Sequence, residues 1–242
     1  MISTSGHLIS KFPEVRFHRT RIFKYSKGYL DAMVNAQANI DGHFFLEDFL
    51  NPSLIAAMEK VYPITPNSDG AETPAYIYSQ YFLGRRATAI SRQNILKKLS
   101  DSFHVTVYTH ENCQAVLPNV LYGGKIDYYN DMPTVFQRSR INLNITLKTI
   151  QTGIPLRAWD ILGCGGFLLS NFQQEPCEYF VPGEDFVYYE STDDAVEKAA
   201  YFLSHENERI EIAHNAVEKI AGSKGCGHIY KTLLSKLVHA RQ

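Results

Sequence analysis

Hydrophobic and polar positions follow two different patterns along the chain, and the change falls near residue 100. Before it, apolar residues recur at helical spacing after two start signals, Asn51-Pro52 and Thr73-Pro74. In each signal a polar residue fits the N-cap, and the proline fits the first helical position. The second pattern runs to Leu99. The first 100 residues therefore predict helices and loops, with no clear strand.

After residue 100, short β-rich runs alternate with helical patterns. Strands are predicted at 103–109, 141–145, 166–170 and 186–189, and helices at 131–139, 155–162, 192–204, 206–220 and from His228 onward. Such alternation is typical of βαβ units, whose parallel sheet is covered by helices on both faces. We therefore predict an α/β, Rossmann-like domain over residues 101–242, preceded by a helical N-terminal arm over residues 1–100.

Composition narrows the class of protein. The 242 residues are 45% apolar and 20% charged, which excludes disordered and collagen-like chains. The longest apolar-plus-glycine run, Ile161 to Leu169, is less than half of the roughly 20 residues that cross a bilayer. No secretory leader is recognisable, and the four cysteines form no CxxC pair. We expect no membrane span and a cytoplasmic location.

Charge is balanced overall, with 24 Lys and Arg against 25 Asp and Glu, but it is unevenly spread. Basic residues gather in 1–30 and 81–100, and acidic residues gather in 175–211. No nucleic-acid-binding motif accompanies the basic segments, and the acidic segment can pair with them. We therefore expect no nucleic-acid partner. The basic helical arm is expected to pack on the sheet domain, or to dock a partner chain or a second copy.

The segment around Gly153 carries the clearest chemical signal. It reads as strand, loop, glycine and helix, so free backbone N–H groups and the positive end of a helix dipole favour a diphosphate there. Arg157 is placed to add a charge-assisted contact, and Asp160, three residues further, to accept hydrogen bonds from a sugar or ribose diol. The alternative is that Arg157 and Asp160 form an exposed pair contributing only about 0.2–0.5 kcal/mol.

Several blocks of the sequence together resemble a known family. They are Tyr128–Phe136, Ile141–Thr146, Gly153–Arg157, Gly165–Leu169, Phe180–Ser191 and His228–Tyr230. In order and spacing they resemble the glycosyltransferase group 1 domain of CgeB/YkvP-like spore proteins over roughly residues 100–240. The resemblance implies the donor-binding C-terminal half of a GT-B fold, which takes a nucleotide-diphosphate sugar as substrate.

The resemblance also implies roles for individual residues. Asp160 would contact the donor ribose, and the other donor-binding positions would be Gly124, Lys125, Ile126, Asn144, Thr146, Gly153, Ile154, Pro155 and Arg157. Further candidates, for which a structural role is the alternative, are His110, Tyr128 and His228. No metal and no cofactor are expected, because a helix dipole and an arginine can neutralise the leaving diphosphate and no Asp-x-Asp motif is present.

These observations support three functions of different kinds. The first is glycosyl transfer from a nucleotide sugar to an unknown glycan, protein or small-molecule acceptor. The second is a non-catalytic nucleotide- or sugar-binding module, and the third is a structural interaction domain. Strand–helix alternation starts only at residue 103, so one α/β domain of a two-domain enzyme is expected. We therefore expect the chain alone to be an incomplete glycosyltransferase.

Overall fold

A six-stranded parallel sheet forms the centre of the protein, in the order β3-β2-β1-β4-β5-β6. The computed structural model describes residues 2–5, 21–65, 70 and 72–224. The strands are β1 (Ile2–Ser5), β2 (Val105–Tyr108), β3 (Leu121–Gly124), β4 (Ile141–Asn144), β5 (Leu168–Asn171) and β6 (Val187–Tyr189). This is the strand order of doubly wound dinucleotide-binding folds, in which the order reverses between β1 and β4.

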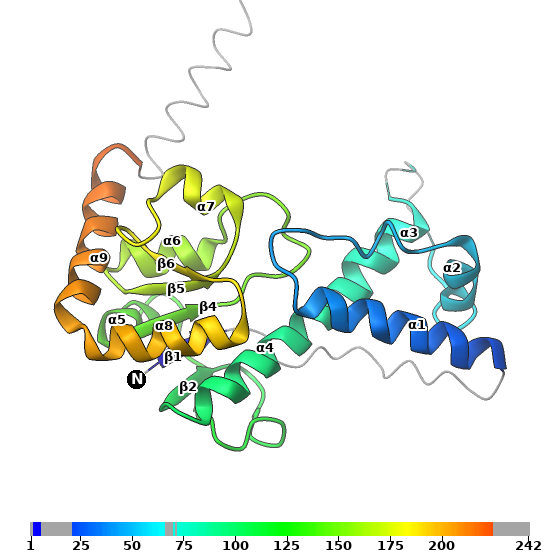
Figure 1. The fold of residues 1–242 in the computed structure, drawn as a ribbon, viewed down its shortest axis with the longest axis horizontal. Coiled ribbons are helices and arrows are strands. Elements are labelled where there is room, and N and C mark those ends of the chain that lie inside the picture. Colours follow the sequence, from blue (N-terminus) through cyan, green and yellow to red (C-terminus); the bar gives the residue numbers. More distant parts are fainter. Residues whose placement is uncertain (1, 6–20, 66–69, 71, 225–242) are drawn as a thin grey trace, which may run out of the picture.

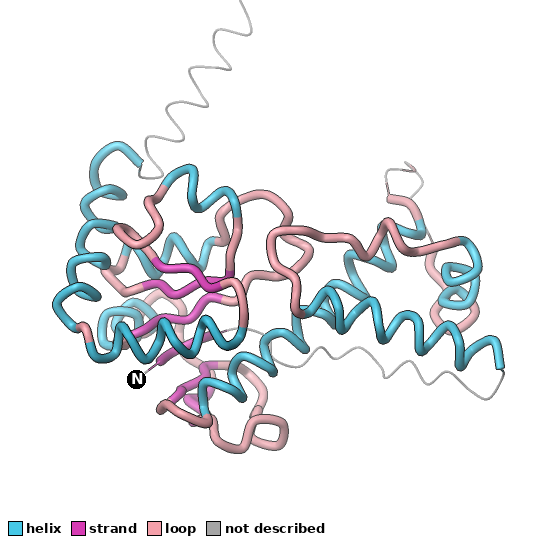
Figure 2. Tube along the Cα trace, viewed as in Figure 1, coloured by secondary structure: helices cyan, strands magenta, loops and turns pink. Residues whose placement is uncertain are grey.

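Helices cover both faces of the sheet, as the sequence predicted (Figures 1 and 2). The helical segments of the described residues are α1 (Arg21–Ala38), α2 (Pro52–Glu59), α3 (Pro74–Ile77), the π-helical segment η1 (Tyr78–Leu83), α4 (Gly84–Ser100), α5 (Met132–Arg138), α6 (Leu156–Gly163), α7 (Gln174–Tyr179), α8 (Thr192–Ser204), α9 (Glu206–Lys219) and η2 (Ile220–Lys224). One buried cluster joins α4 and α8 to the sheet, and a second joins α5 and α6 to its other face. The α/β, Rossmann-like class is confirmed, and it is consistent with one half of a GT-B fold.

The predicted helix starts are confirmed by their caps. The side chain of Asn51 accepts a hydrogen bond from the backbone N–H of Leu54 at 3.0 Å. Thr73 does the same for Tyr76 at 3.1 Å, and helical structure then continues from Pro74 to Ser100. Each cap satisfies one N–H group that the first helical turn leaves without a partner.

Two strands, β1 and β3, were not predicted from the sequence, and β1 changes the topology. β3 contains two glycines and alternates between exposed and half-buried positions, so it lacks a buried apolar run. β1 is only four residues long, yet it pairs with both β2 and β4 in the middle of the sheet. The expectation of no strand before residue 103 was therefore wrong. The helices α1–α4 connect β1 to β2, and we call residues 21–100 the helical insertion.

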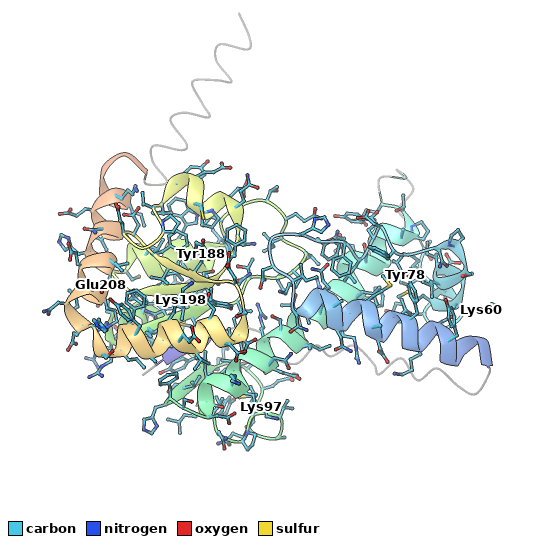
Figure 3. The ribbon with its side chains drawn as sticks, in the orientation of Figure 1. Lys60, Tyr78, Lys97, Tyr188, Lys198 and Glu208 are labelled. Atoms are coloured by element: carbon cyan, nitrogen blue, oxygen red, sulfur yellow. The ribbon has the colours of Figure 1, made fainter. Side chains whose placement is uncertain are left out.

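The helical insertion has a hydrophobic core of its own. Its buried residues come from α1, the loop after α1, α2, η1 and the start of α4. Tyr78 lies at the centre with no exposed surface, and its hydroxyl donates to the backbone oxygen of Tyr62 at 2.6 Å (Figure 3). In Figure 1, α4 extends from this core to the sheet, where it packs against α8 and β2. Of the helical region, α4 packs on the sheet domain, and docking of a partner chain or a second copy stays a prediction.

At the far edge of the sheet, α8 is tied to β6 through one lysine. Lys198 Nζ donates to the backbone oxygen of Tyr188 at 2.7 Å and lies 5.2 Å from the centre of its ring (Figure 3).

Within the described ranges, no helix is long and apolar enough to cross a membrane. The predicted helix from His228 lies outside the described residues.

Candidate functional site

The loop after β4 leaves the carboxyl edge of the sheet beside the reversal of strand order, where ligands of such folds bind. Polar side chains fix its start. Asn144 Nδ2 donates to Thr146 Oγ1 at 2.9 Å and to Ser170 Oγ at 3.0 Å, and the backbone N–H of Thr146 donates to Asn171 Oδ1 at 2.8 Å. Asn144 and Thr146 are both buried, so these groups hold the ends of β4 and β5 together.

One face of α4 supports the same loop from the helical insertion. Thr88 Oγ1 accepts a hydrogen bond from the backbone N–H of Lys148 at 2.9 Å. One helical turn further, Arg92 Nη2 donates to the backbone oxygen of Ile145 at 3.0 Å. Residues four positions apart lie on one face of a helix. Thr88 and Arg92 therefore bind two nearby backbone groups of the loop, those of Lys148 and Ile145.

Gly84, one turn before Thr88, allows the closest approach. A Cβ atom placed on Gly84 would stand 3.0 Å from the backbone oxygen of Ser79 and would overlap the methyl group of Thr149. Any larger residue would therefore push the loop away from α4. The helical insertion thus determines where the loop after β4 runs.

Three predicted residues, Tyr128, Arg157 and Asp160, come together beside α6. The Tyr128 hydroxyl donates a hydrogen bond to Asp160 Oδ2. This hydrogen bond, together with burial, raises the pKa of Tyr128 to about 12. The Arg157 guanidinium lies 5.4 Å from the centre of the Tyr128 ring and 5.5 Å from that of Phe136. The cluster therefore presents a cation and a carboxylate that are both held by an aromatic side chain.

The exposed ion pair considered as the alternative for Arg157 and Asp160 does not form. Asp160 is instead paired with Tyr128, and Arg157 Nη1 is buried without a hydrogen-bond partner among the described residues. The same holds for Glu175 Oε2, which lies 3.8 Å from the position of a Cβ atom on Gly153. Arg157 Nη1 and Glu175 Oε2 are therefore two polar atoms near the start of α6 whose hydrogen-bonding capacity is unused among the described residues.

The backbone at the start of α6 also has free donors. Gly153 has a φ of +97°, a conformation that glycine adopts without strain. The N–H groups of Gly153, Ile154, Leu156 and Arg157 donate no hydrogen bond within the described part of the chain. Pro155, which precedes the first turn, has no N–H group to lose. Free N–H groups at a helix start can bind an anion, although the carboxylate of Glu175 beside Gly153 opposes one. The diphosphate site stays a prediction.

The remaining predicted residues lie apart from this cluster or contribute packing. Gly124 ends β3, Lys125 is exposed, and Ile126 packs against the cluster of α5 and α6. His110 is exposed in the loop after β2, two strands away from β4. His228 lies outside the described residues. The donor-binding roles given to these positions stay predictions.

A cavity of about 210 Å³ that no sequence pattern indicated lies next to the loop after β4. It is lined by segments 37–44, 147–152 and 171–174. At its wall, Asp41 Oδ1 accepts hydrogen bonds from Lys148 Nζ at 2.7 Å and from Asn171 Nδ2 at 2.8 Å. Burial lowers the pKa of Lys148, and the carboxylate of Asp41 opposes this shift.

The contact between Asp41 and Lys148 could not be predicted from the sequence, because 107 positions separate the two residues. Asp41 also belongs to the segment predicted to be a separate arm. One signal was available in the sequence. Lys148 closely follows the apolar strand ending near residue 145, and a lysine that is buried there needs a counter-charge. Among the described residues, no group of three or more His, Cys, Asp or Glu side chains is gathered that could hold a metal.

Together, the doubly wound sheet and the anion-suited start of α6 define a Rossmann-like protein with a candidate phosphate site at the carboxyl edge of its strands. Residues 85–235, more than half of the chain, match the family described as glycosyl transferase-like, and the chain belongs to this family. None of the curated proteins matches the chain. The expected resemblance to glycosyltransferases is confirmed, and the CgeB/YkvP-like group stays a prediction. β1 and the helices before α4 precede the matched residues.

Proposed function

We propose that this chain binds a nucleotide-diphosphate sugar at α6 and supplies the donor half of a glycosyltransferase. The observation that carries the proposal is the convergence of Tyr128, Arg157 and Asp160 beside free backbone N–H groups. Membership of the glycosyl transferase-like family supports it independently.

Each group has a chemical task in this proposal. The N–H groups from Gly153 to Arg157 bind the diphosphate, and the guanidinium of Arg157 adds two parallel donors. Asp160 accepts hydrogen bonds from the ribose diol through Oδ1, because Tyr128 already occupies Oδ2. In such a complex, Tyr128 sets the orientation of the carboxylate and contacts the nucleotide with its ring.

Glycosyl transfer breaks the bond between the sugar C1 and the β-phosphate oxygen and forms a bond from C1 to an acceptor oxygen. Negative charge grows on the leaving diphosphate, and fixed N–H dipoles with Arg157 stabilise it. The acceptor proton must pass to a base that we do not assign. One α/β domain leaves the donor without the enclosure that two domains provide, so we expect binding without full-rate transfer by this chain alone.

Calorimetry and thermal unfolding with UDP, GDP, ADP and their sugars test the proposal. A ligand at 100 times its Kd should stabilise the protein by about 2.7 kcal/mol. Failure of every nucleotide to bind would contradict the proposal. Binding with neither donor hydrolysis nor transfer, even when candidate partner chains are added, would favour the non-catalytic binding module. Full-rate transfer by the purified chain would refute the expectation that it is incomplete.

A further inference from the structure

The cavity between the helical insertion and the loops after β4 and β5 is small and open to a ligand of limited size. Its volume of about 210 Å³ lies below the roughly 300–1,000 Å³ of typical small-molecule pockets. It therefore has room for a single ring, and a nucleoside diphosphate is too large for it. Gln151 and Thr152, which line it, directly precede Gly153 at the candidate phosphate site.

The charges of the cavity favour a neutral ligand. Lys148 is the one Lys or Arg among the described lining residues, and its side chain is only 3% exposed. Its ammonium group is already bound to Asp41 Oδ1 at 2.7 Å and to the backbone oxygen of Ile40 at 3.1 Å. A phosphate would find no available Lys or Arg among the described lining residues and would face the carboxylate of Asp41. An anionic ligand is therefore disfavoured.

The polar groups that remain available suit hydroxyl groups. Asp41 Oδ2 makes no hydrogen bond within the described residues, although Oδ1 of the same carboxylate accepts two. Gln151, Thr152 and Gln174 are exposed side chains that line the cavity and make no hydrogen bond there. These groups offer acceptors and donors side by side, which is what neighbouring hydroxyl groups of a sugar ring require. Phe172 adds an aromatic wall.

The loop that carries Asp41 is already held in place without a ligand. The buried side chain of Gln37 donates to the backbone oxygens of Ile40 at 3.3 Å and His43 at 2.8 Å, and it accepts from the N–H of Phe45 at 2.9 Å. Asp41 itself is fixed by the contacts described above. Because the Asp41 carboxylate is ordered in advance, little conformational entropy is lost when it binds a ligand.

From these observations we propose that the cavity is a binding site for one neutral sugar ring, with Asp41 Oδ2 accepting a hydrogen bond from a ring hydroxyl. The inference rests on the proposed function and adds a role for the helical insertion, whose Asp41 lies outside the residues matched by the family. The ring has two possible sources: the sugar attached to the nucleotide, or a free acceptor sugar.

The experiment measures binding of sugars and nucleotides to the whole chain by calorimetry and saturation-transfer NMR. Probes are UDP, UDP-glucose, UDP-N-acetylglucosamine, GDP, GDP-mannose, and free glucose, N-acetylglucosamine and mannose. Asp41→Asn replaces the free acceptor by a donor. Because it also removes the counter-charge of Lys148, the double variant Gln151→Ala/Thr152→Ala is the second test, since both side chains are exposed. Asn207→Ala, an exposed amide on α9, is the matched control.

We expect both test variants to weaken sugar binding about tenfold, while Asn207→Ala leaves it unchanged. If the donor sugar occupies the cavity, nucleotide sugars bind the parent protein more tightly than the free nucleotides do, and the variants remove that difference. If an acceptor occupies it, free sugar binds also in the presence of nucleotide. Absence of sugar binding in both arms, or sugar binding that neither variant weakens, overturns the inference. Sugar binding without nucleotide binding contradicts only the proposed function.

Discussion

Thr88 Oγ1 accepts a hydrogen bond from the backbone N–H of Lys148 at 2.9 Å, although sixty positions separate the two residues. The contact joins α4 of the helical insertion to the loop after β4. Together with Arg92, it makes the helical insertion a support for the loop that leads into α6. Substitutions in α4 that move this loop should therefore change ligand affinity at the candidate site.

Gly84→Ala should destabilise the protein by about 1–3 kcal/mol. The added methyl group would overlap Thr149 and crowd the Ser79 oxygen, so either the loop or α4 must move. This cost opposes the gain of up to about 1 kcal/mol that alanine brings over glycine in a helix. Urea unfolding measures the difference, and nucleotide affinity should fall as the loop shifts.

Gly28→Ala is the control for this prediction. Gly28 lies in α1, and a Cβ atom there would meet nothing within 4 Å. The same substitution should stabilise the protein by about 0.5–1 kcal/mol. Equal effects of the two substitutions would show that contact with Thr149 does not matter.

Asp160→Ala should weaken nucleotide binding by about 1–3 kcal/mol while the melting temperature of the free protein barely changes. The carboxylate is expected to bind the donor diol, and its contact with Tyr128 is on the surface. Calorimetry with the best-bound nucleotide checks the change. Asp131→Ala, an exposed carboxylate before α5, should bind like the parent. An unchanged Kd for Asp160→Ala would remove this residue from the site.

Arg157→Lys should lower nucleotide affinity even though it keeps the charge. Lysine lacks the planar pair of donors, and it stacks less well between the rings of Tyr128 and Phe136. Binding measured at two salt concentrations separates the loss of charge in Arg157→Ala from the loss of geometry in Arg157→Lys. If both variants bind like the parent, the phosphate lies elsewhere.

Asp41→Asn should destabilise the protein by about 3 kcal/mol, because it leaves the ammonium group of Lys148 buried without a counter-charge. The double variant Asp41→Asn/Lys148→Met should be more stable than the sum of the two single changes predicts. Denaturant unfolding of the four proteins gives the coupling. Additive effects would show that the ion pair contributes nothing.

Tyr78 should make stability fall between pH 10 and pH 12. Burial, assisted by the charge of Glu59, raises the pKa of Tyr78 from 10.0 to about 12. Over that range the folded protein keeps a proton that the unfolded chain has lost, so rising pH favours unfolding. Tyr78→Phe should cost about 1 kcal/mol at neutral pH, since it removes the hydrogen bond to Tyr62.

The cost of Tyr78→Phe should shrink when unfolding is measured above pH 10. Tyr129→Phe removes the same atom from a side chain that is 84% exposed, and it should leave stability at neutral pH unchanged. A cost of Tyr78→Phe that stays constant up to pH 11 would contradict the assignment.

Local signals in the sequence were sufficient for the elements around α6. Pro155, Arg157 and Asp160 lie where the helical pattern placed them, because a short helix between two apolar strands is determined by its own residues. The contact of Tyr128 with Asp160 could not be predicted, since it spans 32 positions and depends on how α5 packs against α6. The spacing of residues along the sequence does not predict a contact that depends on the packing of two helices.

The topology was less predictable for the same reason. β1 has four residues, of which three are Ser or Thr, and its identity as a strand comes from its neighbours β2 and β4. Because β1 is not recognisable in the sequence, the pattern predicts a separate helical arm in place of an insertion. Such an arm gives no basis for predicting that Asp41 contacts Lys148. One unrecognised strand therefore concealed the cavity.

The central place of β1 has a consequence for the order of folding. More than one hundred residues of chain separate β1 from its partners in β2 and β4, whereas fewer than thirty separate paired residues of β4 and β5. Closing the longer loops costs more entropy, and contacts between distant residues form late. Within the sheet of the described residues, strands β4–β6 are hydrogen-bonded to strands β2–β3 only through β1. The two halves should therefore assemble separately and join in the final step, when the four residues of β1 enter between them.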